Sequence, residues 1–266
     1  MKFSEFDKQM RVYENFLDKT IEPNTYFVAR LDGRGFSNFT ENTLSLEKPF
    51  SDRFKELMVL TTLELMNSGF EVIYGYTQSD EISLLFKKDT TVFSRKVRKY
   101  NSTLAGTASA VMSMMTRHIA TFDCRIIPVP NIETVIDYFR WRQEDCQRNA
   151  LNGYCYWELK KSGSTSHAAD SRLRGLGYDE KVKLLLGMGI DWNDVPQWQK
   201  NGIGFSYSEE KHDGLNPITG ETNSVTRRTI DVKYDLPAGK DYGALIESII
   251  NKDSEHSQDT EEIHII

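Results

Sequence analysis

Residues Glu71–Phe86 read EVIYGYTQSDEISLLF. Two runs of aliphatic, aromatic and β-branched residues, Glu71–Tyr76 and Glu81–Phe86, flank the polar stretch Thr77–Asp80. This pattern predicts two antiparallel strands joined by a tight turn. Two adjacent carboxylates, Asp80 and Glu81, stand where the turn meets the second strand. The hairpin therefore combines a fold signal with a candidate for chemistry.

The segments on either side of the hairpin complete a recognisable order of elements. Tyr26–Leu31 (YFVARL) predicts a strand, and the apolar spacing from Phe54 to Leu65 predicts a helix. After the hairpin, 91–120 has a helical pattern, and Phe122–Val129 predicts a further strand. The order β-α-β-β-α-β is that of the ferredoxin-like unit, so we expect an α+β fold with both crossovers right-handed.

The remaining sequence predicts extensions around this core. We expect residues 1–135 to form the core, 136–250 a helical and β extension, and 251–266 a polar, disordered tail. Within the extension, 134–153 has a helical pattern, 161–177 is a Ser- and Gly-rich loop, and Ser224–Leu236 alternates like a strand.

Composition excludes several classes of protein. Of 266 residues, 27% are charged and 39% hydrophobic, which is typical of a globular chain. The net charge of −6 excludes uniform coating of a polyanion, so contact with nucleic acid requires local basic patches. Three cysteines without a CxxC pair, no secretion signal and no apolar stretch of about 18 residues predict a reduced, cytoplasmic protein without a membrane span.

Two acidic turns are candidates for a metal site. Asp32 ends the first strand in the motif LDGRGF, and Asp80 lies at the hairpin tip. A ferredoxin-like sheet places these strands side by side, so the two carboxylates should converge. Converging carboxylates favour a divalent cation, and Mg²⁺ prefers oxygen ligands and phosphates. Two such ions about 3.5–4 Å apart activate an attacking hydroxyl and stabilise a leaving group. The alternative is that both motifs only form turns.

Basic segments are candidates for anion and RNA contacts. The run Arg95–Lys99 (RKVRK) opens the second helix and could clamp a triphosphate, or could be a solvated helix face. Lys48 precedes a helix start, where anions bind. Arg140-Trp141-Arg142, followed by Arg148, Asn149 and Asn152, suits an RNA backbone and a stacked base. The alternative is an amphipathic helix with Trp141 in the core.

Together these motifs resemble the tRNA-histidine guanylyltransferase family, the 3′-to-5′ nucleotide polymerases. The resemblance covers most of residues 3–210, and its motifs occur in the family's order. They are RLDGRGF (Arg30–Phe36), YGYTQSDEIS (Tyr74–Ser83), FSRKVRK (Phe93–Lys99), FDCRIIPVP (122–130), YFRWRQEDCQRNALNGY (Tyr138–Tyr154) and LLLGMGIDWNDVPQWQKNGIG (Leu184–Gly204).

The resemblance implies that 1–135 is a palm-like catalytic polymerase core and that the extension at 136–250 serves tRNA contact and assembly. It also assigns roles to single residues. Asp32, Asp80 and the carbonyl of Gly33 would hold two Mg²⁺ ions, with Glu81 a neighbouring acid that supports them. ATP, GTP and other nucleoside triphosphates would be substrates and tRNA the acceptor, and family members are homotetramers, for which 105–115 is a candidate interface. Nucleotide contacts would come from Asp32, Gly33, Arg34, Gly35, Phe36, Ser37, Ser79 and Asp80, contacts to triphosphate or to the activated 5′ end from Lys48, Lys96 and Lys99, and tRNA contacts from Arg140, Arg142, Arg148, Asn149 and Asn152.

The implied chemistry has two steps, activation of a tRNA 5′-monophosphate by ATP or GTP and attack by the 3′-hydroxyl of an incoming nucleotide. Two positions depart from eukaryotic members. Gln147–Gly153 (QRNALNG) replaces a His-Ile-Asn-Asn-Leu-Tyr-Asn run, and Ser37 replaces a common His. Both resemble the bacterial and archaeal branch, which implies template-directed repair of 5′-truncated tRNA, with G addition to tRNA-His as a second activity to test.

Two other functions share parts of this pattern. A nucleotide-cyclase-like palm enzyme would use the same carboxylates, but such enzymes carry a GG[D/E]EF-type hairpin where this chain has QSDEI. An RNA-recognition module without catalysis would share the βαββαβ order. Its aromatic RNP pattern is absent from the sequence.

Overall fold

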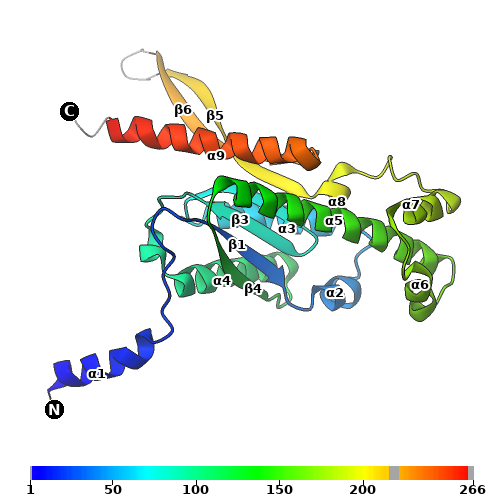
Figure 1. The fold of residues 1–266 in the computed structure, drawn as a ribbon, viewed down its shortest axis with the longest axis horizontal. Coiled ribbons are helices and arrows are strands. Elements are labelled where there is room, and N and C mark those ends of the chain that lie inside the picture. The colour runs from blue at the N-terminus through cyan, green and yellow to red at the C-terminus, as the bar shows by residue number, and fades with distance from the viewer. Residues whose placement is uncertain (1, 216–221, 263–266) are drawn as a thin grey trace.

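The computed structural model describes residues 2–215 and 222–262. These residues form a six-stranded antiparallel sheet in the order β4-β1-β3-β2-β5-β6 (Figure 1). The first four positions have the ferredoxin-like order, which confirms the predicted fold class. The strands are β1 (Tyr26–Gly33), β2 (Val72–Gln78), β3 (Glu81–Phe86), β4 (Phe122–Val129), β5 (Ile203–Leu215) and β6 (Thr222–Lys233).

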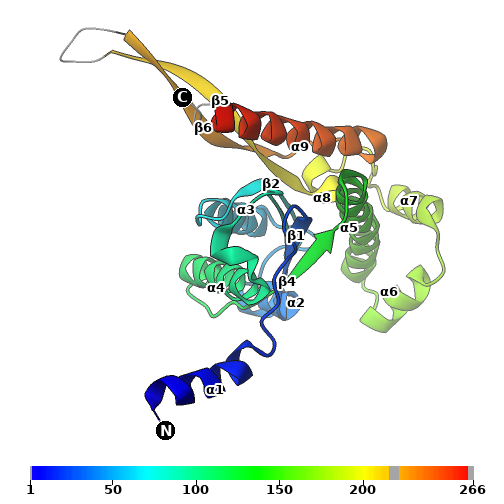
Figure 2. The ribbon, with the colours of Figure 1, turned by 60° about the vertical axis from the view of Figure 1, so that its left-hand side comes forward.

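Helices cover both faces of the sheet. Figure 2 shows α3 (Asp52–Met66) and α4 (Val97–Thr116) on one side of the strands, and α5 (Ile132–Lys161) on the other with α9 (Gly239–Glu262) beside it. The shorter helices are α1 (Phe3–Asn15), α2 (Phe36–Asn38), η1 (Phe39–Thr43), η2 (Val92–Arg95), α6 (Ser166–Leu173), α7 (Tyr178–Gly187) and α8 (Gln197–Asn201).

Burial on both faces explains the sequence of β1. Phe27, Ala29 and Leu31 pack into the core beneath α3 and α4, whereas Val28 belongs to the core beneath α5 and α9. Side chains alternate along a strand, so Arg30 and Asp32 continue the face of Val28. The strand therefore ends by directing two charged side chains to the α5 side of the sheet.

The extension differs from the sequence prediction at two places. The predicted loop 161–177 contains helix α6, which begins because the Thr165 hydroxyl accepts a hydrogen bond from the amide of Ala168. The predicted disordered tail was wrong for residues 251–262, since α9 continues to Glu262. Residues 263–266 lie outside the described residues. Strands β5 and β6 extend the same sheet as β1–β4, and the division at residue 135 stays a prediction.

Arg95, the first cation of the basic run, is structural. Its buried guanidinium donates to the carbonyls of Ile21, Glu22, Thr25, Lys88 and Thr90. It also lies 5.1 Å from the ring centroid of Phe27. A charge satisfied by so many carbonyls fixes the segment that leads into β1 against the connection between β3 and α4. Arg95 therefore belongs neither to a solvated face nor to a phosphate clamp.

Helix α1 stands apart from the sheet and its covering helices (Figures 1 and 2). None of its residues is buried, and Phe3 and Tyr13 are 80% and 71% exposed. No described helix has the length and apolarity needed to cross a membrane.

Candidate active site

The two acidic turns meet at one end of the sheet. β1 and β3 pair so that Asp32 lies opposite Glu81, and the amide of Gly33 donates to the carbonyl of Asp80 at 3.1 Å. Ser79, in the left-handed conformation, donates from its hydroxyl to the Asp80 carboxylate at 3.1 Å. The pairing of β1 with β3 and one main-chain hydrogen bond therefore bring together the two turns that the sequence predicted to converge.

Glycines permit the turn after β1. A Cβ on Gly33 would lie 2.5 Å from the ring of Phe36, which is buried in the core beneath α3 and α4. Gly35 precedes α2 with a φ of 71°. A residue with a side chain would clash at position 33 and be strained at position 35. The tight turn after β1 therefore requires the two glycines of the DGRGF motif.

The environment favours a cation beside these carboxylates. Burial raises the pKa of Asp80 to about 6, and the charges of Asp32 and Glu81 add to that rise. The pKa of Asp32 is also raised, by burial and then by Glu81 and by Asp123 on β4. Asp123 lies opposite Asp32 in the sheet and was not predicted from sequence, because only the strand register reveals it. A bound cation would relieve this repulsion.

Glu81 has a different role because two arginines hold it. Arg30 on β1 donates to one carboxylate oxygen at 2.8 Å, and Arg142 on α5 donates to the other. Arg142 also contacts Asp145 at 2.9 Å and is 3% exposed. This arrangement fixes α5 to the sheet and offsets the charge of Glu81. It fits the supporting role implied for Glu81, and it places Arg142 inside the protein, not on a surface that RNA could contact.

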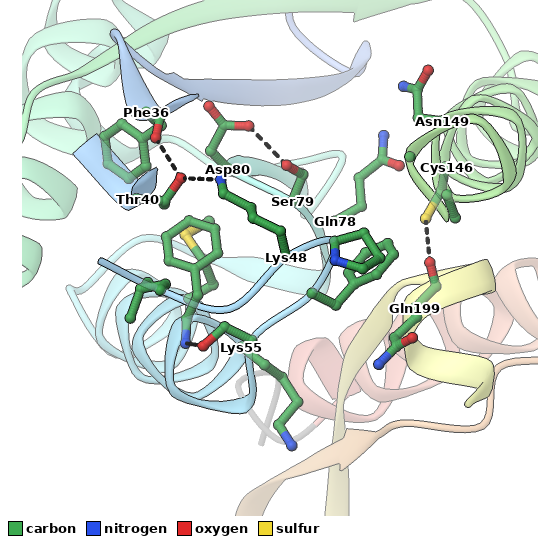
Figure 3. A pocket seen from close by; sticks show the side chains of 18 of the residues that line it. Phe36, Thr40, Lys48, Lys55, Gln78, Ser79, Asp80, Cys146, Asn149 and Gln199 are labelled. Atoms are coloured by element: carbon green, nitrogen blue, oxygen red, sulfur yellow. Dashed lines mark hydrogen bonds between the residues drawn. The ribbon is translucent and has the colours of Figure 1, made fainter. Parts of the chain in front are cut away.

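A cavity of about 390 Å³ opens beside Asp80 (Figure 3). Its walls come from the 36–58 segment, the β2–β3 hairpin, α5 and the start of α8. Asp32 and Gly33 end β1, Arg34 and Gly35 form the turn after it, and none of the four is in the cavity lining. The predicted site residues that line it are Phe36, Ser37, Lys48, Ser79, Asp80, Glu81 and Asn149.

The predicted cations separate into two locations. Lys48 extends along the cavity toward Asp80, and its ammonium donates to the Thr40 hydroxyl at 2.9 Å (Figure 3). Lys96 is paired with Asp18 at 2.9 Å, and Lys99 lies near the ring of Phe93. Both lysines lie at the start of α4. Arg95 holds this start of α4 near the start of β1, whereas Asp32 lies near the opposite end of β1. Within one chain the structure does not bring Lys96 and Lys99 to this cavity.

The remaining candidates for RNA contact differ in exposure. Arg148 is 73% exposed and pairs with Asp145, and Asn152 is also exposed. Asn149 donates to Asp145 at 3.2 Å. Arg140 pairs with Asp137 and packs near Gly243 of α9. A role of these four residues in tRNA binding stays a prediction.

Comparison with known proteins identifies the family. The family model "Thg1: tRNAHis guanylyltransferase" matches residues 7–130, and the model of the Thg1 C-terminal domain matches residues 133–261. The chain belongs to the tRNA(His) guanylyltransferase family. It is accordingly a nucleotidyltransferase, and the cyclase-like and RNA-recognition alternatives are excluded.

Relatives and solved structures agree with this membership. The tRNA(His) guanylyltransferase of Neurospora crassa is 31% identical over 75% of this chain and 72% of its own. The crystal structure of the Saccharomyces cerevisiae family member matches with a TM-score of 0.67 and 27% identity, covering 73% of this chain and 90% of that one. A bacterial Thg1-like protein in complex with GTP matches with a TM-score of 0.64 and 26% identity, covering 95% and 96%.

The donor set of this family member fits magnesium. In the described part of the chain, no group of three or more His, Cys, Asp and Glu side chains forms a complete metal cage. Asp32 and Asp80 would instead supply two carboxylates, and the carbonyl of Gly33 lies in the same turn. Mg²⁺ typically takes one or two carboxylates and completes its shell with phosphates and water.

The raised pKa of Asp80 predicts a pH-dependent effect on stability. Because the folded-state pKa of about 6 lies above the usual 3.8, ionisation of Asp80 destabilises the fold. At pH 8 without metal, Asp80→Asn should raise the free energy of unfolding by about 3 kcal/mol. The gain in the free energy of unfolding should decrease as the pH falls below 6 and be absent below pH 4. Urea unfolding across this range measures it, and an unchanged difference at pH 4 would refute the assignment.

The ion pairs of Glu81 predict coupled effects on stability. Glu81→Gln and Arg142→Gln should each lower the free energy of unfolding by about 2 kcal/mol, since each removes one of the two charged partners of a buried group and leaves the other, Asp145 for Arg142 and Arg30 for Glu81. The double variant should lose clearly less than the sum of the two, as urea unfolding will show. Arg148→Gln, which removes an exposed pair, is the matched control and should change it by less than about 0.5 kcal/mol. Strict additivity would mean that the pair is not coupled.

Proposed function

We propose that this protein repairs the 5′ end of truncated tRNA by adding nucleotides in the 3′-to-5′ direction, with the opposite strand as template. The observation that carries the proposal is the meeting of Asp32 and Asp80 beside a cavity with a lysine in its wall. The bacterial Thg1-like relatives solved with GTP and with ATP support triphosphates as its ligands.

Magnesium is the proposed cofactor, held by Asp32, Asp80 and the carbonyl of Gly33. When bound, it would polarise phosphate oxygens and neutralise charge on the leaving group. The protein's own contribution is orientation. Lys48, already directed along the cavity by Thr40, would bind a phosphate oxygen, and the hydroxyl of Ser79 would keep the Asp80 carboxylate in place.

The same residues would serve two in-line displacements. In the first, an oxygen of the RNA 5′-monophosphate attacks the α-phosphorus of ATP or GTP, and pyrophosphate leaves. In the second, the 3′-hydroxyl oxygen of an incoming nucleotide attacks the activated 5′ phosphorus, and the nucleoside monophosphate leaves. Each step forms one P–O bond and breaks one, so one site can perform both.

Position and sequence of one segment favour repair over dedicated recognition of histidine tRNA. The run Gln147–Gly153 lies on α5, and Asn149, Ala150 and Gly153 within it line the cavity. It replaces the His-Ile-Asn-Asn-Leu-Tyr-Asn run of eukaryotic members, so this chain presents different groups there. G addition to tRNA-His is the second activity that the same chemistry would allow.

Incorporation assays test the proposal. With Mg²⁺ and a tRNA that lacks its first nucleotide, we expect addition of whichever nucleotide pairs with the opposite base. Asp32→Ala and Asp80→Ala should reduce incorporation at least about 1,000-fold, since each removes a metal ligand. Circular dichroism checks that the variants fold. Addition of G regardless of the template would reject repair, and near-normal rates in either variant would reject the metal site.

We further propose that the protein assembles as a homotetramer. Helix α1 supports this, since none of its residues is buried within the chain and its apolar residues Phe3 and Tyr13 are largely exposed. The distance of Lys96 and Lys99 from the cavity also supports it, because another copy could bring them to a neighbouring site. Within 105–115, the candidate interface, Ala108 and Met112 are core residues, whereas Met114 is exposed.

Light scattering measures the assembly. The unaltered chain should have about four times the mass of one 30.7 kDa chain. Replacing Phe3 and Tyr13 together by Asp should yield smaller species, because charge on α1 opposes its burial. Tyr178→Asp, at a similarly exposed position on α7, is the control and should leave the mass unchanged. A monomer for the unaltered chain would refute the assembly.

A further inference from the structure

One wall of the cavity beside Asp80 is aromatic. Phe50, Trp157 and Trp198 line it, and they come from the segment before α3, from α5 and from α8. Each is partly exposed. Figure 3 shows Asn149, Cys146 and Gln199 at the end opposite Asp80. The metal and triphosphate roles proposed above use none of these three rings.

The rings and nearby cations form a surface suited to a flat, anionic ligand. Phe50 and Trp198 meet at 85° with centroids 5.7 Å apart, so their rings form a corner. The ammonium of Lys48 lies 5.7 Å from the ring of Trp157, and that of Lys55 lies 5.0 Å from the ring of Trp198. Aromatic rings interleaved with cations are the arrangement that proteins use to stack nucleobases beside phosphates.

Several polar atoms at the end opposite Asp80 are occupied within the protein. The Gln199 side-chain carbonyl accepts from the hydroxyl of Tyr154, and its main-chain carbonyl accepts from the thiol of Cys146 at 3.8 Å. The amide nitrogen of Asn149 donates to Asp145. These three atoms are engaged before a base arrives and do not read its edge, whereas every base has a face that can stack.

We propose that Phe50, Trp157 and Trp198 bind the base of the nucleoside triphosphate by stacking, without selecting among bases. This rests on the proposed function and adds a division of labour to it. The protein holds any base against the aromatic wall and the phosphates near Asp80 and Lys48, and the opposite RNA strand chooses among the four nucleotides. A site that discriminated by itself would oppose templated repair.

Calorimetric titration of the full chain with Mg²⁺ and without RNA tests the proposal. ATP, GTP, CTP and UTP should bind with affinities within about tenfold of one another. Trp157→Ala and Trp198→Ala should each weaken all four at least about fivefold, the lower limit for one lost stacking contact. Binding of inorganic triphosphate should change less than twofold. Trp157→Phe, which keeps a ring, should retain more affinity than Trp157→Ala.

Matched controls separate stacking from a structural effect. Tyr178→Ala removes an aromatic that is 58% exposed and outside this cavity, and it should leave all affinities unchanged. Melting temperatures check that each variant is folded. Unchanged nucleotide affinity in both tryptophan variants, loss for one base only, or equal loss for inorganic triphosphate would each overturn the proposal. Because these titrations contain no RNA, they are independent of the incorporation assays, which test repair itself.

Discussion

The pairing of β1 with β3 is the constraint on which the rest of the site depends. It sets Asp32 opposite Glu81 and lets the Gly33 amide bond to the Asp80 carbonyl. A slip of one residue would turn every side chain of β1 to the other face, placing Asp32 in the core beneath α3 and α4. The buried alternation of Phe27, Val28 and Ala29 prevents that slip. The hydrophobic core therefore sets the position of the carboxylates.

Concentrating acids at one end of a sheet carries a cost, and the structure offsets part of it. Glu81 is neutralised by Arg30 and Arg142, so its charge is balanced inside the protein. Asp80 has no comparable arginine partner among the described residues, and burial raises its pKa. The two neighbouring acids thus differ in role although they are adjacent in sequence. One connects α5 to the sheet, and the other keeps a charge for which a cation is the natural counterpart.

Sequence patterns predicted the features that depend on residues close together in the sequence. The hairpin, the βαββαβ order and the DGRGF turn follow from alternation, turn residues and glycine. The patterns failed where a residue's role depends on distant partners. Arg95 belongs to a charged run, yet its five carbonyl partners lie in segments that only the fold brings together. Lys96 and Lys99 resemble phosphate ligands by motif, but α4 begins at the far end of β1. Arg142 is buried because Glu81 lies beneath it.

The cavity shows why motif and fold must be considered together. The part that we propose to hold phosphates comes from motifs that the sequence displays, because a carboxylate at a strand end and a lysine near a helix start are local features. Its aromatic wall is assembled from residues 50, 157 and 198, whose separation along the chain hides their relation. Stacking of a base requires only an aromatic ring at each of these positions, so no sequence motif marks them. If the template chooses the base, as proposed, the protein needs strict chemistry at the phosphates and tolerance at the base, and carboxylates beside aromatic rings would supply both.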